Sequence, residues 1–413
     1  MRESSGSPKR YWLGTHRIVD PEATVERVRG LLPAFGITRI ADVTGLDRIG
    51  IPVAIVVRPN GRALAVAQGK GVTRPAAQAS GLMESIEAWH AEQLVLPTLF
   101  NSIEELRYTH PLIDLARLPR RRGSRIDPHQ RLLWVEGRDL LAEGGAALWL
   151  PRDLVSTDYT LPPPPGAGCF CASSNGLASG NDRAEALVQA LCEVIERDAM
   201  ALWRAAPAER RAATRIDAGE VDDPVCRDLL AALEAADIAV GIWDVTSDTG
   251  VAAFHVELAE SGSRLPLFSP IVASGSGCHP ARGVALARAL TEAAQSRLTG
   301  IAGSRDDIDP RIYQPDGWQH AAWLDAVSTA EPQRPFAAVP DAVHPTAEAD
   351  LAFLLARLRA IGIRQAAAVD LSREELFGLP VVRVVVPGLE TDPRHPFYVP
   401  GPRARAAAAG GRA

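Results

Sequence analysis

The chain is organised around SNGLASGNDRAEALVQALCEVIERD, residues 174–198. A glycine-containing loop opens here into a helical pattern, because Asn181 or Asp182 is suited to cap the first backbone N–H groups and no proline interrupts the residues after them. Apolar residues at helical spacing predict a buried stripe, so Glu193, Glu196 and Arg197 project from another side of the helix. The start of such a helix also favours anions.

Related units occur upstream and downstream of this stretch. Residues 69–71, GKG, lead through Pro75 into a helical pattern that carries Glu84 and Glu87. Residues 275–280, GSGCHP, lead into a third pattern that carries Glu292 and Gln295. Each unit predicts a flexible loop, a helix start, and acidic or amide side chains three residues apart on one face. A single acidic helix face is usually a solvated one, but three ordered repeats favour a shared cleft.

Composition restricts the classes of function. The chain has 413 residues, 46% of them hydrophobic, which is sufficient for a large core. A net charge of −6 argues against general nucleic-acid binding. The first ten residues lack an apolar stretch and no run reaches transmembrane length, so we expect neither secretion nor a membrane protein. Five cysteines, an odd number, favour a reducing compartment, and we expect the cytoplasm.

Local patterns predict a mixed α/β domain over residues 15–400, with disordered ends at 1–12 and 403–413. A helix is expected after Asp20, and a hairpin is expected around Asn60-Gly61. The pattern of residues 304–346 indicates no role for them. The other expected strands and helices are strands at 51–58, 64–68, 132–136, 146–150, 238–244, 252–258, 365–370 and 381–386, and helices at 227–236 and 351–361.

The clustered carboxylates require a cation. Two glutamate pairs and Glu292 would repel one another by several kcal/mol if they met in one cleft as bare anions. Hard oxygen ligands indicate Mg²⁺ or Ca²⁺, and glycine-containing helix starts indicate phosphates, so together they predict Mg²⁺ bound with a nucleoside triphosphate. Lys70, Arg197 and Arg297 would offset the remaining phosphate charge. The chain has no GxxxxGK[ST] or kinase signature, its cysteines lack zinc spacing, and neither a Cys nor a Ser nucleophile is indicated.

The three blocks, in this order and spacing, resemble the ATP-binding motifs of the YcaO domain family across residues 15–400. The resemblance implies largely antiparallel sheets, with helices that bring the three blocks into one nucleotide cleft. It implies ATP and Mg²⁺ as cofactors. The resemblance implies that Glu84, Glu87, Glu193 and Glu196 are both catalytic residues and Mg²⁺ ligands. It implies Glu185 and Glu292 as further Mg²⁺ ligands. Implied nucleotide-binding residues are Arg17, Thr24, Lys70, Ser80, Asn181, Glu185, Arg197, Gln295 and Arg297.

The resemblance also implies a reaction. A nucleophile adds to a peptide backbone carbonyl, the oxygen takes the γ-phosphate of ATP, and phosphate then leaves. A sulfide equivalent gives a thioamide, whereas a neighbouring Cys, Ser or Thr gives an azoline. This chain lacks the Pro-x-Pro-x-Pro terminus of many azoline-forming members, and it resembles members that act beside a TfuA-type partner protein in ribosomal peptide modification. A homodimer is compatible with the family.

Other interpretations stay open at this point. Ala88 follows Glu87 where many family members have Arg, and Ala178 stands where some members have Ser in the central loop. The first departure motivates a non-catalytic scaffold that binds nucleotide or peptide. An azoline-forming cyclodehydratase is a further alternative, and a generic α/β protein with three exposed acidic helices is the least specific one.

Overall fold

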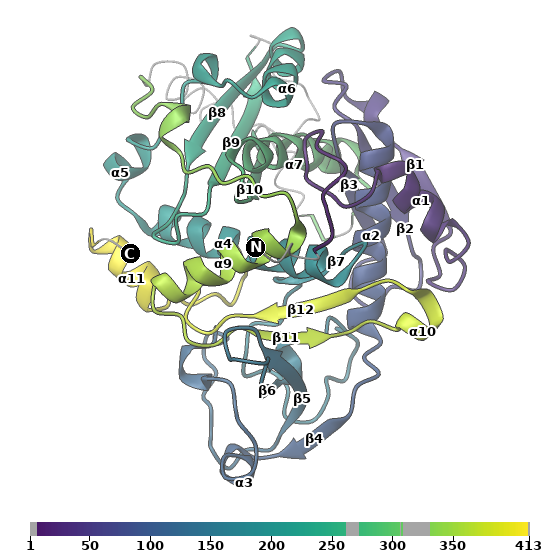
Figure 1. Ribbon diagram of the computed structural model, residues 1–413, viewed down its shortest axis with the longest axis vertical. Coiled ribbons are helices and arrows are strands. Elements are labelled where there is room, and N and C mark those ends of the chain that lie inside the picture. The colour runs from purple at the N-terminus through teal and green to yellow at the C-terminus, as the bar shows by residue number, and fades with distance from the viewer. Residues whose placement is uncertain (1–5, 262–271, 306, 309–330, 412–413) are drawn as a thin grey trace.

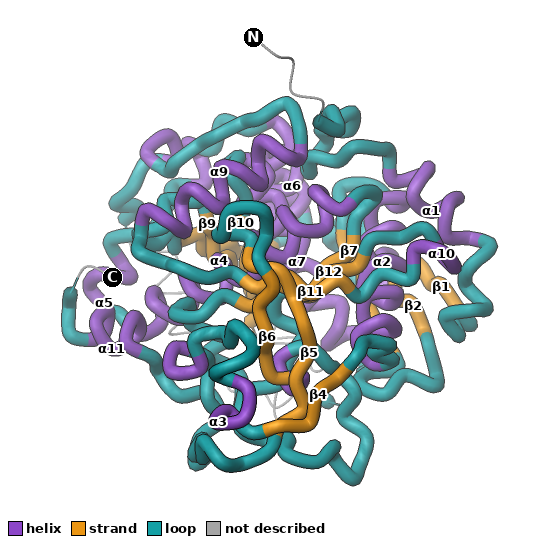
Figure 2. Tube along the Cα trace, turned by 60° about the horizontal axis from the view of Figure 1, so that its bottom comes forward, coloured by secondary structure: helices purple, strands orange, loops and turns teal. Residues whose placement is uncertain are grey.

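The computed structural model describes residues 6–261, 272–305, 307–308 and 331–411. It contains three sheets, and every pairing between named strands in these residues is antiparallel (Figure 1). Two sheets have three strands, in the orders β1-β2-β3 and β10-β9-β8. The third has the order β4-β5-β11-β12-β7, with β6 paired to β5 (Figure 2). The expected mixed α/β fold with antiparallel sheets is therefore confirmed.

The strands are β1 (Arg39–Asp42), β2 (Val53–Val57), β3 (Val66–Lys70), β4 (Thr98–Asn101), β5 (Leu132–Asp139), β6 (Ala147–Pro151), β7 (Leu177–Ser179), β8 (Ile238–Asp244), β9 (Ala253–Glu260), β10 (Val272–Cys278), β11 (Ala367–Asp370) and β12 (Val381–Val385). Each strand expected from the sequence overlaps one of these. β2 and β3 form the expected hairpin, with Val57 opposite Val66.

The helices are α1 (Pro21–Arg29), α2 (Arg74–Glu92), α3 (Ile103–Leu106), α4 (Arg183–Ala205), α5 (Ala208–Ala212), α6 (Pro224–Ala235), α7 (Arg282–Ala302), α9 (Ala347–Ala360), α10 (Glu374–Phe377) and α11 (Pro402–Ala408). Asp182 caps α4, because its side chain accepts from Glu185 N at 2.8 Å. Of residues 304–346, for which the sequence indicated no role, 306 and 309–330 fall outside the described residues. None of the helices described is both long and apolar enough to cross a membrane, and the cytoplasmic location stays a prediction.

The three motif helices α2, α4 and α7 pack directly on strands, and this corrects the expectation of flexible glycine loops. Gly69 lies in β3, and Gly275 and Gly277 lie in β10. A Cβ atom on Gly69 would come within 1.9 Å of Ala77 O, and one on Gly275 would come within 2.3 Å of Ala293 N. These glycines therefore allow helix and strand backbones to approach closely. Figure 1 shows α7 between the β8–β10 sheet and the β1–β3 sheet.

Segments near both chain ends contact distant parts of the chain. Residues 6–19, here called the N-terminal strap, are anchored by a β-bridge between Pro8 and Thr346, and the side chain of Lys9 is buried. Residues 1–5 lie outside the described part. At the other end, residues 402–408 form α11, and Arg403 Nη2 lies 2.8 Å from buried Asp198 Oδ2. Long-range ion pairs therefore join residues 6–12 and 403–411 to the rest of the chain, and disorder at the ends stays a prediction.

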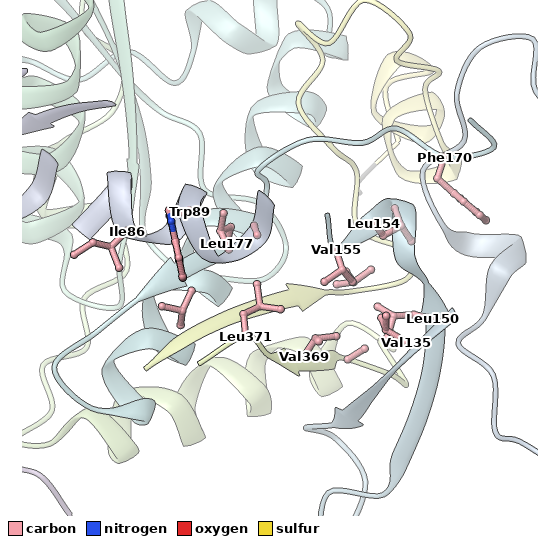
Figure 3. Close-up of a cluster of buried hydrophobic side chains, with 14 of the residues drawn as sticks. Ile86, Trp89, Val135, Leu150, Leu154, Val155, Phe170, Leu177, Val369 and Leu371 are labelled. Atoms are coloured by element: carbon pink, nitrogen blue, oxygen red, sulfur yellow. The ribbon is translucent and has the colours of Figure 1, made fainter. Parts of the chain in front are cut away.

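One large hydrophobic core lies between α2 and the six-stranded sheet. It contains Trp89 and Ile86 from α2, Val135 and Leu150 from β5 and β6, and Val369 from β11 (Figure 3). At its edge the ring of His90, 1% exposed, packs against the aromatic rings of Phe35, Trp89 and Phe377. Burial lowers the pKa of His90 to about 4.

The free energy of unfolding should therefore fall in mild acid. His90 has a pKa of about 4 in the folded chain and about 6.5 when unfolded, so the unfolded state binds more protons as the pH drops through this window. We expect wild type to lose about 2 kcal/mol of stability through this group between pH 7 and pH 5. Urea titrations of His90→Phe should show a correspondingly weaker pH dependence. His129→Gln, at an exposed histidine, is the control, and identical slopes for His90→Phe and wild type would contradict the assignment.

Candidate functional site

A cleft of about 910 Å³ opens where α2, α4 and α7 meet the N-terminal strap, β3 and β10. Every site residue predicted from the sequence lines this cleft except Arg297. The predicted residues that line it are Arg17, Thr24, Lys70, Ser80, Glu84, Glu87, Asn181, Glu185, Glu193, Glu196, Arg197, Glu292 and Gln295. Acidic side chains from three distant segments of the chain therefore face one hollow.

Arg297 is the exception. The residue is 2% exposed and lies outside the cleft lining, with Nε 2.8 Å from Asp47 Oδ2 and Nη2 paired with Glu260. Arg297 thus joins α7 to strand β9 and to the segment after β1. The structure gives it a role in the packing of α7 rather than in the cleft.

The first glutamate pair comes from α2. Glu87 Oε1 accepts from both the backbone N–H and the hydroxyl of Ser179, at 2.8 and 2.7 Å, and this connects α2 to the central loop. Burial, with a smaller contribution from the nearby Glu84, outweighs the hydrogen bonds from Ser179 and raises the pKa of Glu87 to about 8. The side chain of Glu84 is exposed to the cleft, but desolvation by the cleft walls around it raises its pKa to about 7. In the absence of a cation, the raised pKa values favour the protonated, neutral form of both side chains.

The second pair comes from α4. Burial raises the pKa of Glu193 to about 7. Glu196 is 3% exposed and accepts from Ser276 Oγ at 2.8 Å, which connects α4 to β10. Arg197 lies between them, with its guanidinium nitrogens 3.9 Å from Glu193 Oε1 and 3.6 Å from Glu196 Oε1. Burial alone would lower the pKa of Arg197, but the neighbouring carboxylates outweigh it and raise the value.

The third block adds one carboxylate and one amide from α7. Glu292 Oε2 lies 2.7 Å from Lys70 Nζ. Burial would raise the pKa of Glu292, but Lys70 and Arg197 outweigh burial and lower that pKa to about 2. Gln295 Nε2 donates to Gln68 O at 2.7 Å, so this amide connects α7 to strand β3. Ser80 lines the same region from α2.

Four of the predicted nucleotide residues contact one another where the strap and α1 meet the start of α4, a region here called one end of the cleft. Glu185 Oε1 accepts from the backbone N–H and the side-chain amide of Asn181, both at 3.1 Å, and lies 3.4 Å from Arg17 Nη1. The hydroxyl of Thr24 donates to Asn181 Oδ1 at 3.1 Å. Arg17, Thr24, Asn181 and Glu185 are therefore one hydrogen-bonded unit, built from the strap, α1 and the start of α4.

The donor set fits Mg²⁺ bound together with phosphates. Among the described residues, no three His, Cys, Asp or Glu side chains form a ready-made metal site. Mg²⁺ is usually held by one or two carboxylates and by substrate phosphates rather than by an all-protein cage. The two glutamate pairs lie beside Lys70 and Arg197 and match that requirement, and the pKa values of Glu84, Glu87 and Glu193 are raised.

Sequence reasoning missed several residues of the cleft. Arg288 lines it from α7 and donates from Nη1 to Gln189 Oε1 at 2.8 Å. Its position four residues before Glu292 places both on one helix face, so the same spacing rule could have found it. Arg394 and Tyr159 also line the cleft, but they belong to irregular segments without a repeating pattern.

Comparisons with known proteins place the chain in a family. Residues 68–390 match the family model of the YcaO cyclodehydratases, described as ATP- and Mg²⁺-binding. An uncharacterized protein in the tfuA 3′ region of Rhizobium leguminosarum bv. trifolii is 38% identical over 91% of this chain and 89% of its own length. An uncharacterized Methanothermobacter thermautotrophicus protein is 35% identical over 90% and 94%.

Two solved structures share the fold. A YcaO protein from Methanopyrus kandleri bound with AMPPCP and Mg²⁺ superposes with a TM-score of 0.71 at 23% identity, covering 93% of this chain and 95% of its own. A heterocyclase in complex with substrate and cofactor gives a TM-score of 0.75 at 21% identity, covering 94% of this chain and 54% of its own. The predicted cofactors, ATP and Mg²⁺, are those that the family description names. The chain, with its three acidic helix faces around one cleft, belongs to the YcaO family.

Proposed function

We propose that this protein uses ATP and Mg²⁺ to activate a backbone amide of a peptide and installs a thioamide together with a TfuA-like partner. The observation that carries the proposal is the convergence of Glu84, Glu87, Glu193, Glu196 and Glu292 with Lys70 and Arg197 in one cleft. The relative in a tfuA 3′ region supports the partner and hence the sulfur chemistry.

The two glutamate pairs, with Glu185 and Glu292, would hold Mg²⁺ against the phosphates. When bound, Mg²⁺ supplies positive charge to the phosphates as the γ-phosphoryl group transfers. Lys70, Arg197 and Arg288 add cationic side chains on the same walls. Arg17, Thr24, Ser80, Asn181 and Gln295 would position the rest of the nucleotide. The chemistry balances as peptide amide, sulfide and ATP giving thioamide, ADP and phosphate.

The direct test is incubation of the full chain with Mg-ATP, sulfide and a candidate peptide, with and without the TfuA-like partner. Mass spectrometry should find that the mass of the peptide increases by the difference of one O-to-S exchange, and ADP should form at the same time. Loss of one water instead would support an azoline, the second candidate, which the cyclodehydratase description of the family favours. If neither mass change nor ADP appears, the enzymatic proposal is wrong.

Calorimetry distinguishes the proposed enzyme from a scaffold that binds nucleotide without turnover. Such a protein would bind ATP and release no phosphate, and Glu193→Ala would change affinity alone. The glutamate pairs argue against it, because clustered carboxylates without a cation are costly to keep in a partly buried cleft.

A further inference from the structure

Asp350, on α9, is buried among positively charged and imidazole groups outside the three motif blocks. Its carboxylate pairs with Lys9, and both side chains are 2% exposed. His344 Nδ1 lies 2.8 Å from Asp350 Oδ1, and His279 Nε2 lies 4.0 Å from Oδ2. A buried ion pair of this kind is weak support for stability, so its position in the fold calls for another explanation.

The partner of Asp350 belongs to the N-terminal strap. Lys9 N donates to Pro345 O at 3.0 Å, which fixes the strap beside the start of α9. Two residues later the strap turns back on itself, because Tyr11 and Arg17 form an antiparallel bridge with N–H donors and carbonyl acceptors 2.9 and 3.0 Å apart. The position of Lys9 therefore sets the register of Arg17.

Arg17 connects the strap to the cleft. Its guanidinium lies 3.4 Å from Glu185 Oε1, and the next backbone N–H, of Ile18, donates to Glu185 Oε2 at 3.0 Å. Glu185 in turn holds Asn181, whose side chain accepts from Thr24. The unit at this end of the cleft thus depends on where the strap lies.

We propose that Asp350 is a positioning residue for nucleotide binding, acting through Lys9 and the strap on Arg17 and Glu185. The proposal rests on the proposed function, since it assumes that this end of the cleft takes the nucleotide. Asp350 touches no nucleotide itself. It fixes the strap before binding, so that less ordering is left to the binding step.

The experiment measures binding of AMPPCP with Mg²⁺ by calorimetry in the full chain. Asp350→Asn and Lys9→Met are each expected to weaken binding about tenfold, the effect of losing one charge-assisted contact. Where turnover is detectable, KM for ATP should rise while kcat at saturating ATP stays close to wild type. Lys9→Arg, which keeps the charge, should restore most of the affinity. Asp350→Asn leaves Lys9 buried without a carboxylate and could fail to fold for that reason. Lys9→Met removes this charge and tests the same link independently.

A double-mutant cycle with Arg17→Ala decides whether the effect passes through Arg17. In that background Asp350→Asn should cause little further loss. Equal losses in both backgrounds, or no loss in either, would overturn the inference while leaving the site itself intact. If Arg17→Ala alone leaves binding unchanged, both the inference and the nucleotide assignment fall. Glu26→Gln, at an exposed ion pair of α1, is the matched control.

Discussion

Replacing Glu193 by glutamine is expected to reduce Mg²⁺-dependent ADP formation at least ~100-fold, a loss of about 3 kcal/mol of transition-state stabilisation. The substitution keeps the size of the side chain and removes one charge from the cluster on α4. Glu193 faces the same cleft as Glu84, and its carboxylate raises the pKa of Glu84, so both act on one region of space.

The measurement is ADP release with saturating peptide over a range of Mg²⁺ concentrations. The variant should need more Mg²⁺ for half-maximal rate, as well as a lower maximum. Glu26→Gln, whose carboxylate lies on the exposed face of α1, should behave as wild type. Wild-type turnover by Glu193→Gln would remove this residue from the metal-binding group and weaken the proposed function as a whole.

Much of the site is predictable from spacing alone. In an α-helix each residue turns by about 100°, so side chains three apart share a face. That rule places Glu84 with Glu87 and Glu193 with Glu196, and the structure brings both pairs into the cleft. The hairpin at Asn60-Gly61 and strand β8 are predictable from equally local patterns.

The same rule also explains why Arg297 lies outside the cleft lining. Gln295 lies about 60° around α7 from Glu292, whereas Arg297 lies about 140° away, on another side of the helix. The resemblance to the family motif carried Arg297 to the nucleotide as part of the same block as Glu292 and Gln295. Helical geometry favours the opposite side, where Asp47 and Glu260 meet it.

Contacts between distant segments could not be predicted from the sequence. Lys9 and Asp350 pair from opposite ends of the chain, and Ser179 meets Glu87 across 92 positions. No local pattern signals either contact. The glycines of β3 and β10 were assigned to loops for a related reason. Their small size allows a helix from elsewhere in the chain to pack closely, but in the local sequence a glycine also indicates a loop.

Arg297→Met is expected to destabilise the protein by about 3–5 kcal/mol, because it leaves the buried carboxylate of Asp47 without this cation and removes Arg297 from Glu260, which Arg48 also pairs with. Chemical denaturation measures the loss of stability. Arg29→Met, which removes an exposed partner of Glu26, should cost no more than about 1 kcal/mol.

The same variant distinguishes a structural arginine from a nucleotide ligand. At a temperature where Arg297→Met remains folded, AMPPCP with Mg²⁺ should bind it nearly as tightly as wild type, whereas Arg197→Met should bind much more weakly. Arg197 lines the cleft between two carboxylates, and Arg297 does not line it. A stable Arg297→Met protein that no longer binds the analogue would return Arg297 to the nucleotide site and require α7 to present a different face to the cleft.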